Sequence, residues 1–472
     1  MKLRTALLLF GLSLGLAALG FTTPNVTAQT ETILYSFGSS PNEDGDEPLA
    51  ALVQGSDGNL YGTTSSAGTN YGTVFRITPT GSLTNLHIFG NSPDGAFPHA
   101  ALVQGSDGSF YGTTAEGGTN PNSAGTVFRI SPSESYTSLY SFGSSPSDGN
   151  FPYAGLVQGS DGNFYGTTAA GGANDYGTVF RVSPGGSETN LYSFIGPPND
   201  GGAPYAGLVQ GSDGNFYGTT SKGAAGGGNV FRISPSGCYT NLHSFSGLPT
   251  DGTNPYGGLT QGSDGNFYAT TGNGGTHNAG TVFRISPSGI YTTLYSFGSS
   301  PNDGFDVYAG LVQGSDGNFY GTTHDGGANG YGIVFRVSPS GSESNLHSFL
   351  RSRNDGFRLV AGLVQGSDGS FYGTTELGGE SGGGTVFKLI TPLNPPPNQI
   401  SAAQVVGNDI YLSIPSVAGE TYQLQFSSSM QPTNWVNVPG VSVTNSIGAL
   451  LTVTNFGGVV GPQGFYRFDI TP

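Results

Sequence analysis

Short apolar segments alternate with turn residues along most of this chain. In the stretch that starts at Ala309, an apolar segment leads into the turn Asp316-Gly317, and further segments rich in aromatic and β-branched residues span 318–323, 333–337 and 345–349. Short segments of this kind, bounded by Asp-Gly and Pro-Ser-Gly turns, predict strands joined by tight turns. No part of the stretch has a helical apolar period, and its glycines disfavour long helices.

The same pattern recurs with a fixed period of about 52 residues, which indicates a repeat architecture. Its most regular element is the phrase Gln-Gly-Ser-Asp-Gly, whose seven copies start at Gln54, Gln104, Gln158, Gln210, Gln261, Gln313 and Gln365. Four strands in each repeat predict a four-stranded antiparallel blade, and seven repeats predict a seven-bladed β-propeller.

The strand count also predicts how the ring closes. The fourth-strand pattern occurs seven times, but its first copy precedes the first repeat, and the seventh repeat ends at Lys388 without one. We therefore expect Ile33 to Phe37 to pair beside Thr385 to Leu389 and complete the last blade. Such pairing removes two exposed sheet edges, which an open array of repeats would leave.

The two ends of the chain differ from the repeats. Residues 1–28 have the charged start, apolar run and Val26-Thr27-Ala28 site of a signal peptide, so the propeller is expected over 29–391. A Pro-rich linker follows at 392–399. Residues 400–472 hold the only tryptophan, Trp435, and alternating segments that predict a small β-sandwich. No later stretch is apolar enough to form a transmembrane helix, so a secreted or cell-surface protein is expected.

Charge and composition narrow the range of partners. The net charge is −16 with only 9% charged residues, and an acidic surface repels phosphate backbones, so nucleic acid is not an expected partner. Cys238 is the single cysteine, so disulfides do not stabilise the chain. No cofactor is predicted. The expected protein is a monomer whose partner is an extracellular glycan or another protein.

The recurring Gly-Leu-Val-Gln-Gly-Ser-Asp-Gly-Asn-Phe-Tyr-Gly-Thr-Thr and Gly-Thr-Val-Phe-Arg resemble the GloVer tandem repeat of cyanobacterial and verrucomicrobial proteins. The resemblance covers roughly Ile33 to Ile390. It implies an exported bacterial protein of the choice-of-anchor kind, with a variable C-terminal attachment region, and implies no particular activity. The tail, with Tyr422-Gln423-Leu424-Gln425 and Asn434-Trp435, is similar to C-terminal domains of large exported verrucomicrobial proteins.

One aspartate recurs in every repeat phrase and is interpreted as a structural turn residue, because Asp-Gly forms tight hairpins. The seven are Asp57, Asp107, Asp161, Asp213, Asp264, Asp316 and Asp368. A ring of calcium sites is the alternative, but one aspartate per turn supplies too few oxygens. A second Asp-Gly lies in each connection between blades, and in the first repeat it belongs to the cluster Glu43 to Glu47. That cluster is either a cation site or a solvated acidic loop.

One base follows each Val-Phe pair of the third strand, and a base on an apolar strand needs a partner if it is buried. We expect structural ion pairs with the aspartates of the connections for Arg76, Arg129, Arg181, Arg232, Arg284, Arg336 and Lys388. A ring of ligand-binding arginines is the alternative. The six histidines show no metal-ligand spacing, so no metal site is predicted. His87, His243 and His347 take the place of a fourth-strand tyrosine, which indicates a structural role.

Residues that differ between repeats mark the expected ligand site. The loops from strand two to three and from strand four to the next blade share one face, where a pocket at the mouth of the ring is the default site. The first set of loops supplies the candidate ligand-binding residues Glu116, Asp175, Lys222, His277, His324, Asp325 and Glu376, and Glu380 lies beside them. The second set supplies Asp46, His99, Asn254, Asp306 and Arg358.

Three functions fit this pattern. The uniform repeats favour a non-enzymatic module that binds a glycan or protein and is attached or displayed by its tail. A propeller enzyme acting on extracellular polysaccharide needs two carboxylates facing each other across the mouth, and no catalytic pair is assigned. A purely structural surface-layer component is the third function.

Overall fold

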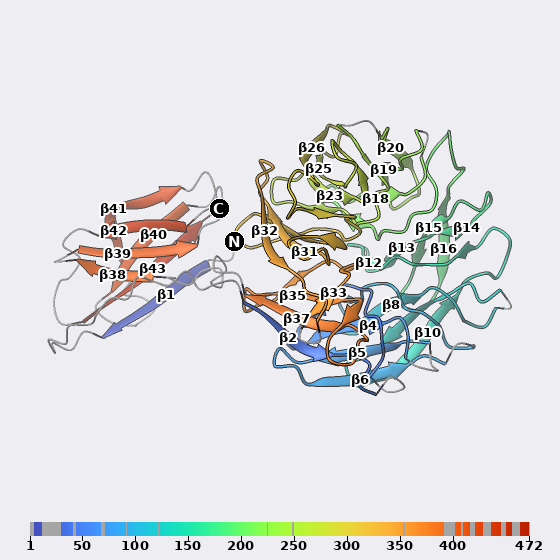
Figure 1. The fold of residues 1–472 in the computed structure, drawn as a ribbon, viewed down its shortest axis with the longest axis horizontal. Coiled ribbons are helices and arrows are strands. Elements are labelled where there is room, and N and C mark those ends of the chain that lie inside the picture. Colours follow the sequence, from blue (N-terminus) through green and yellow to red (C-terminus); the bar gives the residue numbers. More distant parts are fainter. Residues whose placement is uncertain are drawn as a thin grey trace.

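Each repeat folds into one four-stranded antiparallel sheet, and the described part of the chain contains seven such sheets arranged as a ring (Figure 1). The predicted all-β, seven-bladed propeller is therefore confirmed. The computed structural model describes residues 4–11, 30–390 except 41–43, 68–70, 91, 121, 224, 248–249 and 353–354, and in the tail 402–406, 409–415, 421–427, 436–444, 450–455 and 463–471.

The blades follow one another along the chain, and neighbouring strands within each blade are hydrogen-bonded in the order that follows. The first four are blade 1, with β3 (Val53–Gln54), β4 (Leu60–Thr64), β5 (Thr73–Ile77) and β6 (Leu83–Ile88); blade 2, with β7 (Val103–Gln104), β8 (Phe110–Thr114), β9 (Thr126–Ile130) and β10 (Tyr136–Ser141); blade 3, with β12 (Val157–Gln158), β13 (Phe164–Thr168), β15 (Thr178–Val182) and β16 (Glu188–Ser193); and blade 4, with β17 (Val209–Gln210), β18 (Phe216–Thr220), β19 (Asn229–Ile233) and β20 (Tyr239–Ser244). The last three are blade 5, with β22 (Thr260–Gln261), β23 (Phe267–Thr271), β25 (Thr281–Ile285) and β26 (Tyr291–Ser296); blade 6, with β28 (Val312–Gln313), β29 (Phe319–Thr323), β31 (Ile333–Val337) and β32 (Glu343–Ser348); and blade 7, with β34 (Val364–Gln365), β35 (Phe371–Thr375), β37 (Thr385–Ile390) and β2 (Thr30–Ser36).

The hydrophobic core lies between blades rather than inside one. The second strand of each blade is buried on both faces because each face packs against other side chains, as in β18. In blade 4, Tyr217 stacks on Phe267 of blade 5 with ring centroids 4.0 Å apart. Gly218 leaves room for this packing, since a Cβ there would lie 2.7 Å from the ring of Phe231. Core clusters of this kind join each pair of neighbouring blades.

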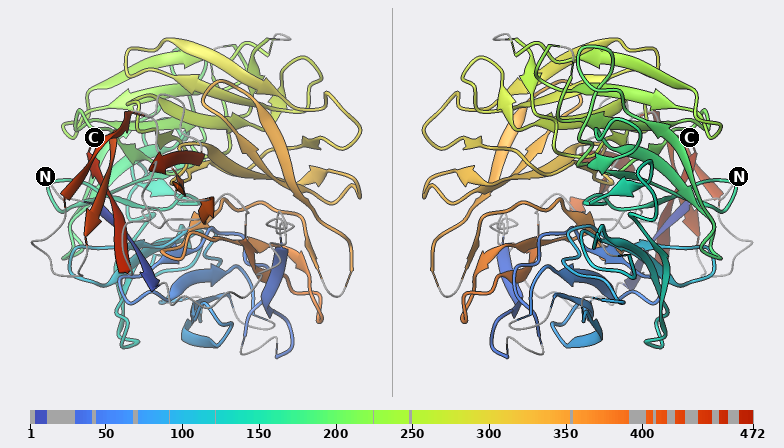
Figure 2. Two further views of the ribbon diagram at one scale, coloured as in Figure 1. Left: turned by 90° about the vertical axis from the view of Figure 1, so that its left-hand side faces the viewer. Right: turned by 90° about the vertical axis from the view of Figure 1, so that its right-hand side faces the viewer.

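The first strand of the propeller completes the last blade, as the strand count predicts. β2 pairs antiparallel with β37, and the pairs include Ile33 with Phe387 and Ser36 with Thr385. Both side views in Figure 2 show the blue N-terminal part of the ring next to its orange C-terminal part. This pairing covers the edge that β37 would otherwise expose.

Glutamines of the repeat phrase connect neighbouring blades. In each blade, the side-chain oxygen of this glutamine accepts a hydrogen bond from the backbone N–H of the phrase serine in the preceding blade, at 2.8–2.9 Å. The glutamine amide also donates to a glycine carbonyl of its own turn, as Gln210 does to Gly214 at 3.2 Å. The phrase therefore repeats because it forms the contact between blades.

Short ladders bring the two sets of variable loops together. Each connection into a blade pairs with the loop between strands two and three of the same blade. The two-residue ladders are β11 (Gly149–Asn150) with β14 (Ala170–Gly171), β21 (Gly252–Thr253) with β24 (Asn273–Gly274), β27 (Gly304–Phe305) with β30 (Asp325–Gly326), and β33 (Gly356–Phe357) with β36 (Leu377–Gly378). Single bridges such as Ala96 to Glu116 do the same elsewhere. The two sets of loops thus share one face of the ring, as expected.

The described part of the tail forms two antiparallel sheets. One contains β38 (Ala402–Val406), β39 (Asp409–Pro415) and β42 (Leu450–Asn455), and the other contains β40 (Thr421–Ser427), β41 (Val436–Thr444) and β43 (Gln463–Thr471). β1 (Arg4–Gly11) joins the second sheet by pairing with β43. Figure 1 shows these strands together, beside the ring. The sandwich stays a prediction, and the predicted linker 392–399 and Trp435 lie outside the described residues.

β1 lies within the predicted signal peptide, so it pairs with β43 only while residues 1–28 remain attached to the chain. Cleavage after Ala28 would remove β1 and leave the edge of β43 unpaired, and this cleavage stays a prediction. In the part of the chain that the structure describes, no helix has the length and hydropathy needed to span a bilayer.

Candidate ligand-binding site at the ring mouth

The seven turn aspartates are held in a network within their own blades. The tyrosine of the second strand donates its hydroxyl to Oδ2 of the aspartate at 2.8–3.0 Å in all seven blades. In blade 4, Asn215 also donates its backbone N–H and its side-chain amide to Asp213. Partial burial would raise the pKa of Asp213, but these hydrogen bonds outweigh it and hold the pKa below its usual value. The geometry is that of a side-chain-stabilised turn.

The aspartates of the connections between blades also accept hydrogen bonds. In the first repeat, this decides against one of the two expected alternatives, the solvated acidic loop. Asp44 is 5% exposed and accepts hydrogen bonds from the hydroxyls of Tyr35 and Ser39 at 3.1 and 2.7 Å. It therefore does not belong to a solvated acidic loop. Its acceptor sites are occupied by donors of the preceding fourth strand and its turn, because the connection folds back onto that strand.

All seven third-strand bases are half-buried, so none of them is a fully buried charge that requires a partner. Arg129 pairs with Asp107 and Lys388 with Asp368, each at 2.8 Å. These partners are turn aspartates of the same blade rather than aspartates of the connections. The register explains the difference, since Arg129 lies opposite Tyr111 on the neighbouring strand and Tyr111 reaches the same carboxylate.

Two further bases donate to nearby hydroxyls: Arg181 lies 3.5 Å from Thr189, and Arg336 lies 3.5 Å from Ser344. Arg76, Arg232 and Arg284 lie close enough to the second-strand tyrosines of their own blades to lower those tyrosines' pKa values, although burial of the tyrosines raises the pKa values overall. The bases thus belong to the walls of the blades and not to the mouth.

The mouth of the ring is built from one repeated backbone unit, which we call the mouth pair. In each blade, a non-glycine residue of the connection has a φ of +51° to +60°, and its carbonyl accepts the backbone N–H of a residue in the loop between strands two and three. The seven mouth pairs are Glu47 with Ser65, Phe97 with Ala115, Phe151 with Ala169, Ala203 with Ser221, Asn254 with Gly272, Asp306 with His324, and Arg358 with Glu376. A positive φ is strained for such residues, and strain of this kind is concentrated at functional sites.

Aromatic side chains form an arc across five consecutive blades, two residues after the strained position. The arc runs through His99, Tyr153, Tyr205, Tyr256 and Tyr308, and the separations of successive ring centroids are 5.4, 5.7, 6.0 and 5.6 Å. These are equivalent positions of adjacent blades, and equivalent positions come this close only near the axis of the ring. Tyr205 is 42% exposed, so the arc presents aromatic surface to solvent.

A charged sector lies at the end of the arc, over blades 6, 7 and 1. The ring of Tyr308 meets that of His324 at 5.4 Å, and Nδ1 of His324 lies 2.7 Å from Oδ2 of Asp325. Burial, and then the charge of Asp325, raises the pKa of Asp306. Burial also raises the pKa of Glu376, against the opposing charges of Arg358 and His324. In blade 1, Ser65 donates its hydroxyl to Glu47 at 3.2 Å.

The structure therefore brings together three of the seven candidate residues, His324, Asp325 and Glu376. Glu116 lies in the mouth near Tyr153, whose pKa is raised first by burial and then by the charge of Glu116. The nitrogen Nζ of Lys222 lies 5.9 Å from the ring centroid of Tyr176, apart from the charged sector.

The side chains of two of the candidates make hydrogen bonds within their own loops. Asp175 has a φ of +58° and accepts the backbone N–H of Gly171 at 2.8 Å, which makes it a turn residue. His277 is exposed and its Nδ1 lies 3.0 Å from the hydroxyl of Thr276.

Sequence reasoning missed most of the aromatic arc. Of its members, only His99 stands out as a candidate by sequence, although one column of the repeat, directly before Ala-Gly-Leu or Gly-Gly-Leu, holds tyrosine in four successive copies. That column was the available indication. The seven strained positions had none, because their side chains range from Glu and Arg to Phe and Ala.

Comparison with solved structures yields propellers at low sequence identity. An oligogalacturonate lyase in complex with manganese has 12% identity and a TM-score of 0.48, with 83% of this chain and 98% of that chain covered. A periplasmic gluconolactonase of Pseudomonas aeruginosa has 16% identity and a TM-score of 0.43, with 84% and 98% covered. At these values neither likeness indicates what this chain binds or catalyses. No protein with a curated description matches the chain.

The family comparison is more specific. The model of the Gloeobacter/Verrucomicrobia repeat matches residues 20–159, 144–313 and 299–411, which together span all seven blades. This agrees with the resemblance carried by the repeat phrase. The chain belongs to the Gloeobacter/Verrucomicrobia repeat family.

Proposed function

We propose that this protein is an exported, non-enzymatic binding module that holds an extracellular glycan at the mouth of the ring, with the tail serving for attachment or display. The aromatic arc from His99 to Tyr308 is the observation that carries the proposal. A tyrosine offers an apolar ring face and a polar hydroxyl. A sugar ring likewise has an apolar C–H face and a rim of hydroxyls, so a row of tyrosines matches a short chain of sugars.

The charged sector completes such a site with hydrogen-bonding groups. His324, Arg358 and the carboxylates of Asp306, Asp325 and Glu376 are placed where a sugar at the end of the arc would present its hydroxyls. Carboxylates outnumber bases there, and the whole chain has a net charge of −16. Electrostatics therefore favour neutral sugars over acidic ones.

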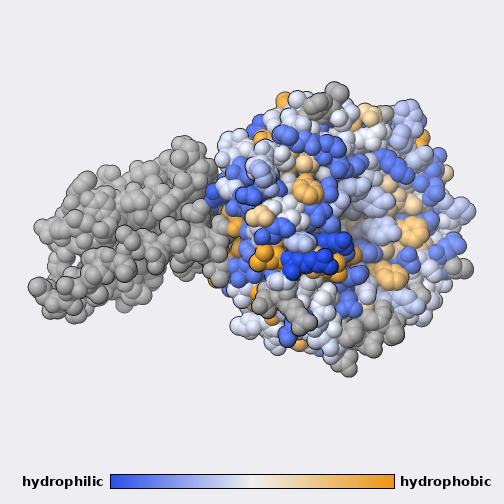
Figure 3. All heavy atoms as spheres, in the orientation of Figure 1, coloured by the Kyte–Doolittle hydropathy of each residue, from blue (hydrophilic) through white to orange (hydrophobic). Residues whose placement is uncertain are grey.

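The surface of the ring supports a polar ligand. In Figure 3, hydrophobic residues on the visible face of the ring form small separate groups among hydrophilic residues. A ligand that docked by apolar area would require a larger continuous patch. Extracellular action, which rests on the predicted signal peptide, and a monomeric state are both parts of the same proposal.

A glycan array probed with the purified protein tests the proposal, followed by calorimetry on the best ligand. Tyr205→Ala and Tyr256→Ala should each weaken binding about tenfold, because each removes one stacking ring. Ile290→Ala is a matched control. It removes a side chain that is 71% exposed in a turn between strands three and four, at the opposite end of a blade. Unchanged affinity in both folded tyrosine variants would contradict the proposal.

One observation favours a second function, that of a polysaccharide-active enzyme. Asp306 and Glu376 both have raised pKa values, and His324 influences both. A carboxyl with a raised pKa and a second nearby carboxylate are the groups that glycosidases use. Incubating array-positive glycans with the protein and looking for new reducing ends or unsaturated ends separates the functions. Turnover that is lost in both Asp306→Asn and Glu376→Gln would favour the enzyme.

A further inference from the structure

Every seam between neighbouring blades contains the same three positions near its outer edge, which we call the seam triad. The first is the tyrosine or histidine of the fourth strand, the second is the aspartate of the connection, and the third is the first residue of the next blade's fourth strand or its equivalent. The seven triads are Tyr35–Asp44–Leu83, His87–Asp94–Tyr136, Tyr140–Asp148–Glu188, Tyr192–Asp200–Tyr239, His243–Asp251–Tyr291, Tyr295–Asp303–Glu343 and His347–Asp355–Glu31.

In six of these triads the first residue contacts the aspartate directly. The tyrosines donate their hydroxyls at 2.6–3.1 Å. The histidines His87 and His243 place Nε2 at 2.9 and 3.2 Å from Asp94 and Asp251. In both histidine seams the third residue is a tyrosine that stacks on the imidazole, with centroids 3.8 and 4.0 Å apart. A histidine at this position therefore normally hydrogen-bonds the aspartate.

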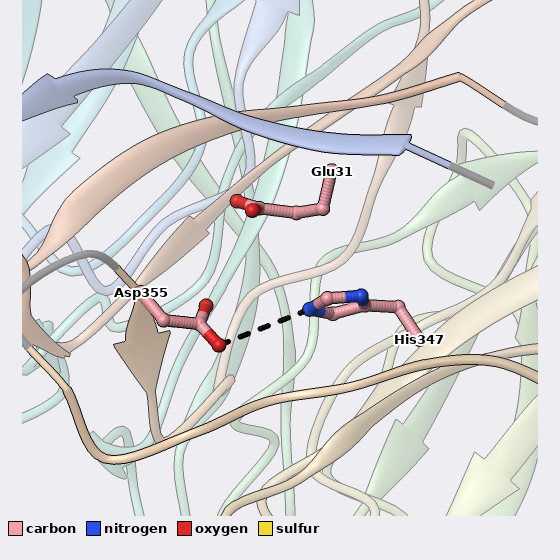
Figure 4. Close-up of side chains that lie close together, drawn as sticks. All are labelled: Glu31, His347 and Asp355. Atoms are coloured by element: carbon pink, nitrogen blue, oxygen red, sulfur yellow. Dashed lines mark ion pairs between the residues drawn. The ribbon is translucent and has the colours of Figure 1, made fainter. Parts of the chain in front are cut away.

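The seam between blades 6 and 7 differs, because its third residue is the carboxylate Glu31. There Nε2 of His347 lies 4.0 Å from Oδ2 of Asp355, beyond hydrogen-bonding distance. Nε2 of His347 and Oε1 of Glu31 are both buried atoms without a hydrogen-bond partner. Buried polar atoms without a partner also occur in other seams, at Tyr136, Tyr239 and Glu343, but among the described seams this one alone places a histidine nitrogen of this kind beside two carboxylates. Figure 4 shows the three side chains pointing toward a common space.

We propose that Glu31, His347 and Asp355 form a binding site for one divalent transition-metal ion of the Zn²⁺ type. Ligand atoms of the three residues lie within 4.8 Å of one another. Ligands of a tetrahedral zinc ion at about 2.1 Å lie roughly 3.4 Å apart, so a small inward movement of the side chains completes the site. One imidazole nitrogen and two carboxylate oxygens suit zinc or manganese better than calcium, which takes six to eight oxygens.

The surroundings suit metal binding. The side chain of Asp355 is 8% exposed and is oriented by the backbone N–H groups of Leu350 and Gly356, at 2.7 and 2.8 Å. Hydrogen bonds to a ligand carboxylate fix its direction in known metal sites. The side chain of His347 is 23% exposed, so the site lies close to the surface of the ring although the ligand atoms themselves are buried. Three protein ligands leave a fourth position for water.

The position of the site gives the ion a role in closing the ring. Glu31 lies on β2, the strand that completes blade 7, whereas His347 and Asp355 belong to blade 6 and to the connection after it. A bound ion therefore ties the N-terminal strand to the neighbouring blade across a sequence gap of more than 300 residues. Because the ligands come together only in the closed ring, metal binding stabilises the closed state.

The test uses the full secreted protein without a histidine tag, stripped with EDTA and titrated with Zn²⁺ by calorimetry. We expect one tight equivalent per chain and a melting temperature that rises by at least about 5 °C at saturation. X-ray absorption of the loaded protein should show a first shell of nitrogen and oxygen with a single imidazole. The proposal concerns divalent transition-metal ions as a class. Binding of Mn²⁺ or Co²⁺ that is likewise weakened by His347→Tyr therefore also supports the site.

The chain supplies its own matched variants. His347→Tyr recreates the Tyr–Asp–Glu composition of the triads that contain Glu188 and Glu343, so the protein should fold and lose at least about 100-fold in affinity. Glu31→Gln keeps the shape of the side chain and should also weaken binding. His243→Tyr makes the same exchange at a seam whose third residue is Tyr291, and should leave binding unchanged. The proposal would be overturned if the chain bound no zinc ion at about 100 micromolar Zn²⁺. It would also be overturned if His347→Tyr and the wild type bound Zn²⁺ with equal affinity.

Discussion

Ser367 of blade 7 donates its backbone N–H to the side-chain oxygen of Gln54 in blade 1, at 2.8 Å, although 313 residues separate them in sequence. The same contact joins all other neighbouring blades. The seam that closes the ring is thus built like the six seams within the chain, and its contribution to stability can be compared with theirs.

Replacing Gln54 should destabilise the protein as much as replacing an internal glutamine. We expect Gln54→Ala and Gln210→Ala each to lower the free energy of unfolding by about 1 kcal/mol, since each loses hydrogen bonds near the surface. Denaturant midpoints of the two variants and the wild type measure this. A closed ring is contradicted if Gln210→Ala destabilises and Gln54→Ala does not.

Deleting residues 29–38 should be far more damaging than any single exchange. The deletion removes β2, exposes the edge of β37 and opens the core that contains Phe37. We expect a lower unfolding midpoint and a greater tendency to associate, because an unpaired strand edge recruits other chains. Light scattering and thermal melting are the measurements, and an unchanged midpoint would show that β2 is dispensable.

Two half-buried glutamates should make the protein less stable as pH rises toward neutrality. Burial, together with the charges of Asp148 and Asp303, raises the pKa of Glu188 and of Glu343 from 4.5 to about 7. The folded state therefore holds protons that the unfolded state has released. The contribution is fully present below pH 4.5 and is lost as pH rises through about 7.

The double variant Glu188→Gln, Glu343→Gln checks this pH dependence. Tyr140 remains as the neighbour of position 188 and Tyr295 as the neighbour of position 343, and the amides cannot ionise. We expect a gain of about 1 kcal/mol per site at pH 8 relative to the wild type, and no comparable gain at pH 4.5. Urea midpoints at the two pH values measure it. Equal differences at both pH values would show that these carboxyls do not carry the effect.

Arg129→Ala should lower the free energy of unfolding only slightly. The pair with Asp107 is partly exposed, with side-chain exposures of 42% and 39%, so we expect a loss of less than about 1 kcal/mol. A buried pair would cost about 3–5 kcal/mol. Tyr111→Phe provides the comparison, because it removes the hydroxyl bonded to the same carboxylate. Chemical unfolding of both variants distinguishes the cases, and a large loss for Arg129→Ala would indicate a buried pair.

The turn aspartates should show no dependence on metal. Their oxygens are bonded to asparagine and tyrosine donors, as at Asp213. In the His347→Tyr variant, which lacks the proposed zinc ligand, EDTA should therefore leave the melting temperature unchanged. A remaining EDTA-dependent loss of several degrees would mean that these or other carboxylates hold a cation.

The fold was predictable because its determinants are local and periodic. The repeat phrase showed the blades, and the displaced fourth strand at Leu34 showed the closure, which the pairing of β2 with β37 confirms. The partner of Arg129 was not predictable, because side-chain reach and strand register decide between Asp107 and an aspartate of the connection. The sequence left open whether the base is buried, and the structure shows that the side chain of Arg129 is 42% exposed.

The mouth was predictable only in outline. His324 and Glu376 stood out because charged residues replace small ones at equivalent positions of the repeat. Tyr205 and Tyr256 did not stand out, since aromatic residues are common in every blade and only the approach of blades near the axis makes them neighbours. Glu31 and His347 could not be connected at all from spacing, because the closing of the ring alone brings them together.

The mouth pairs separate backbone geometry from side-chain identity. Phe151, Asp306 and Arg358 adopt nearly the same φ, +57° to +60°, and each accepts the same backbone hydrogen bond. A change of residue at any of these positions therefore alters the chemistry of the mouth without altering the scaffold beneath it. The seven mouth-pair positions can therefore be varied independently of the fold. A combinatorial library over these positions is a direct route to new ligand specificities on the same scaffold.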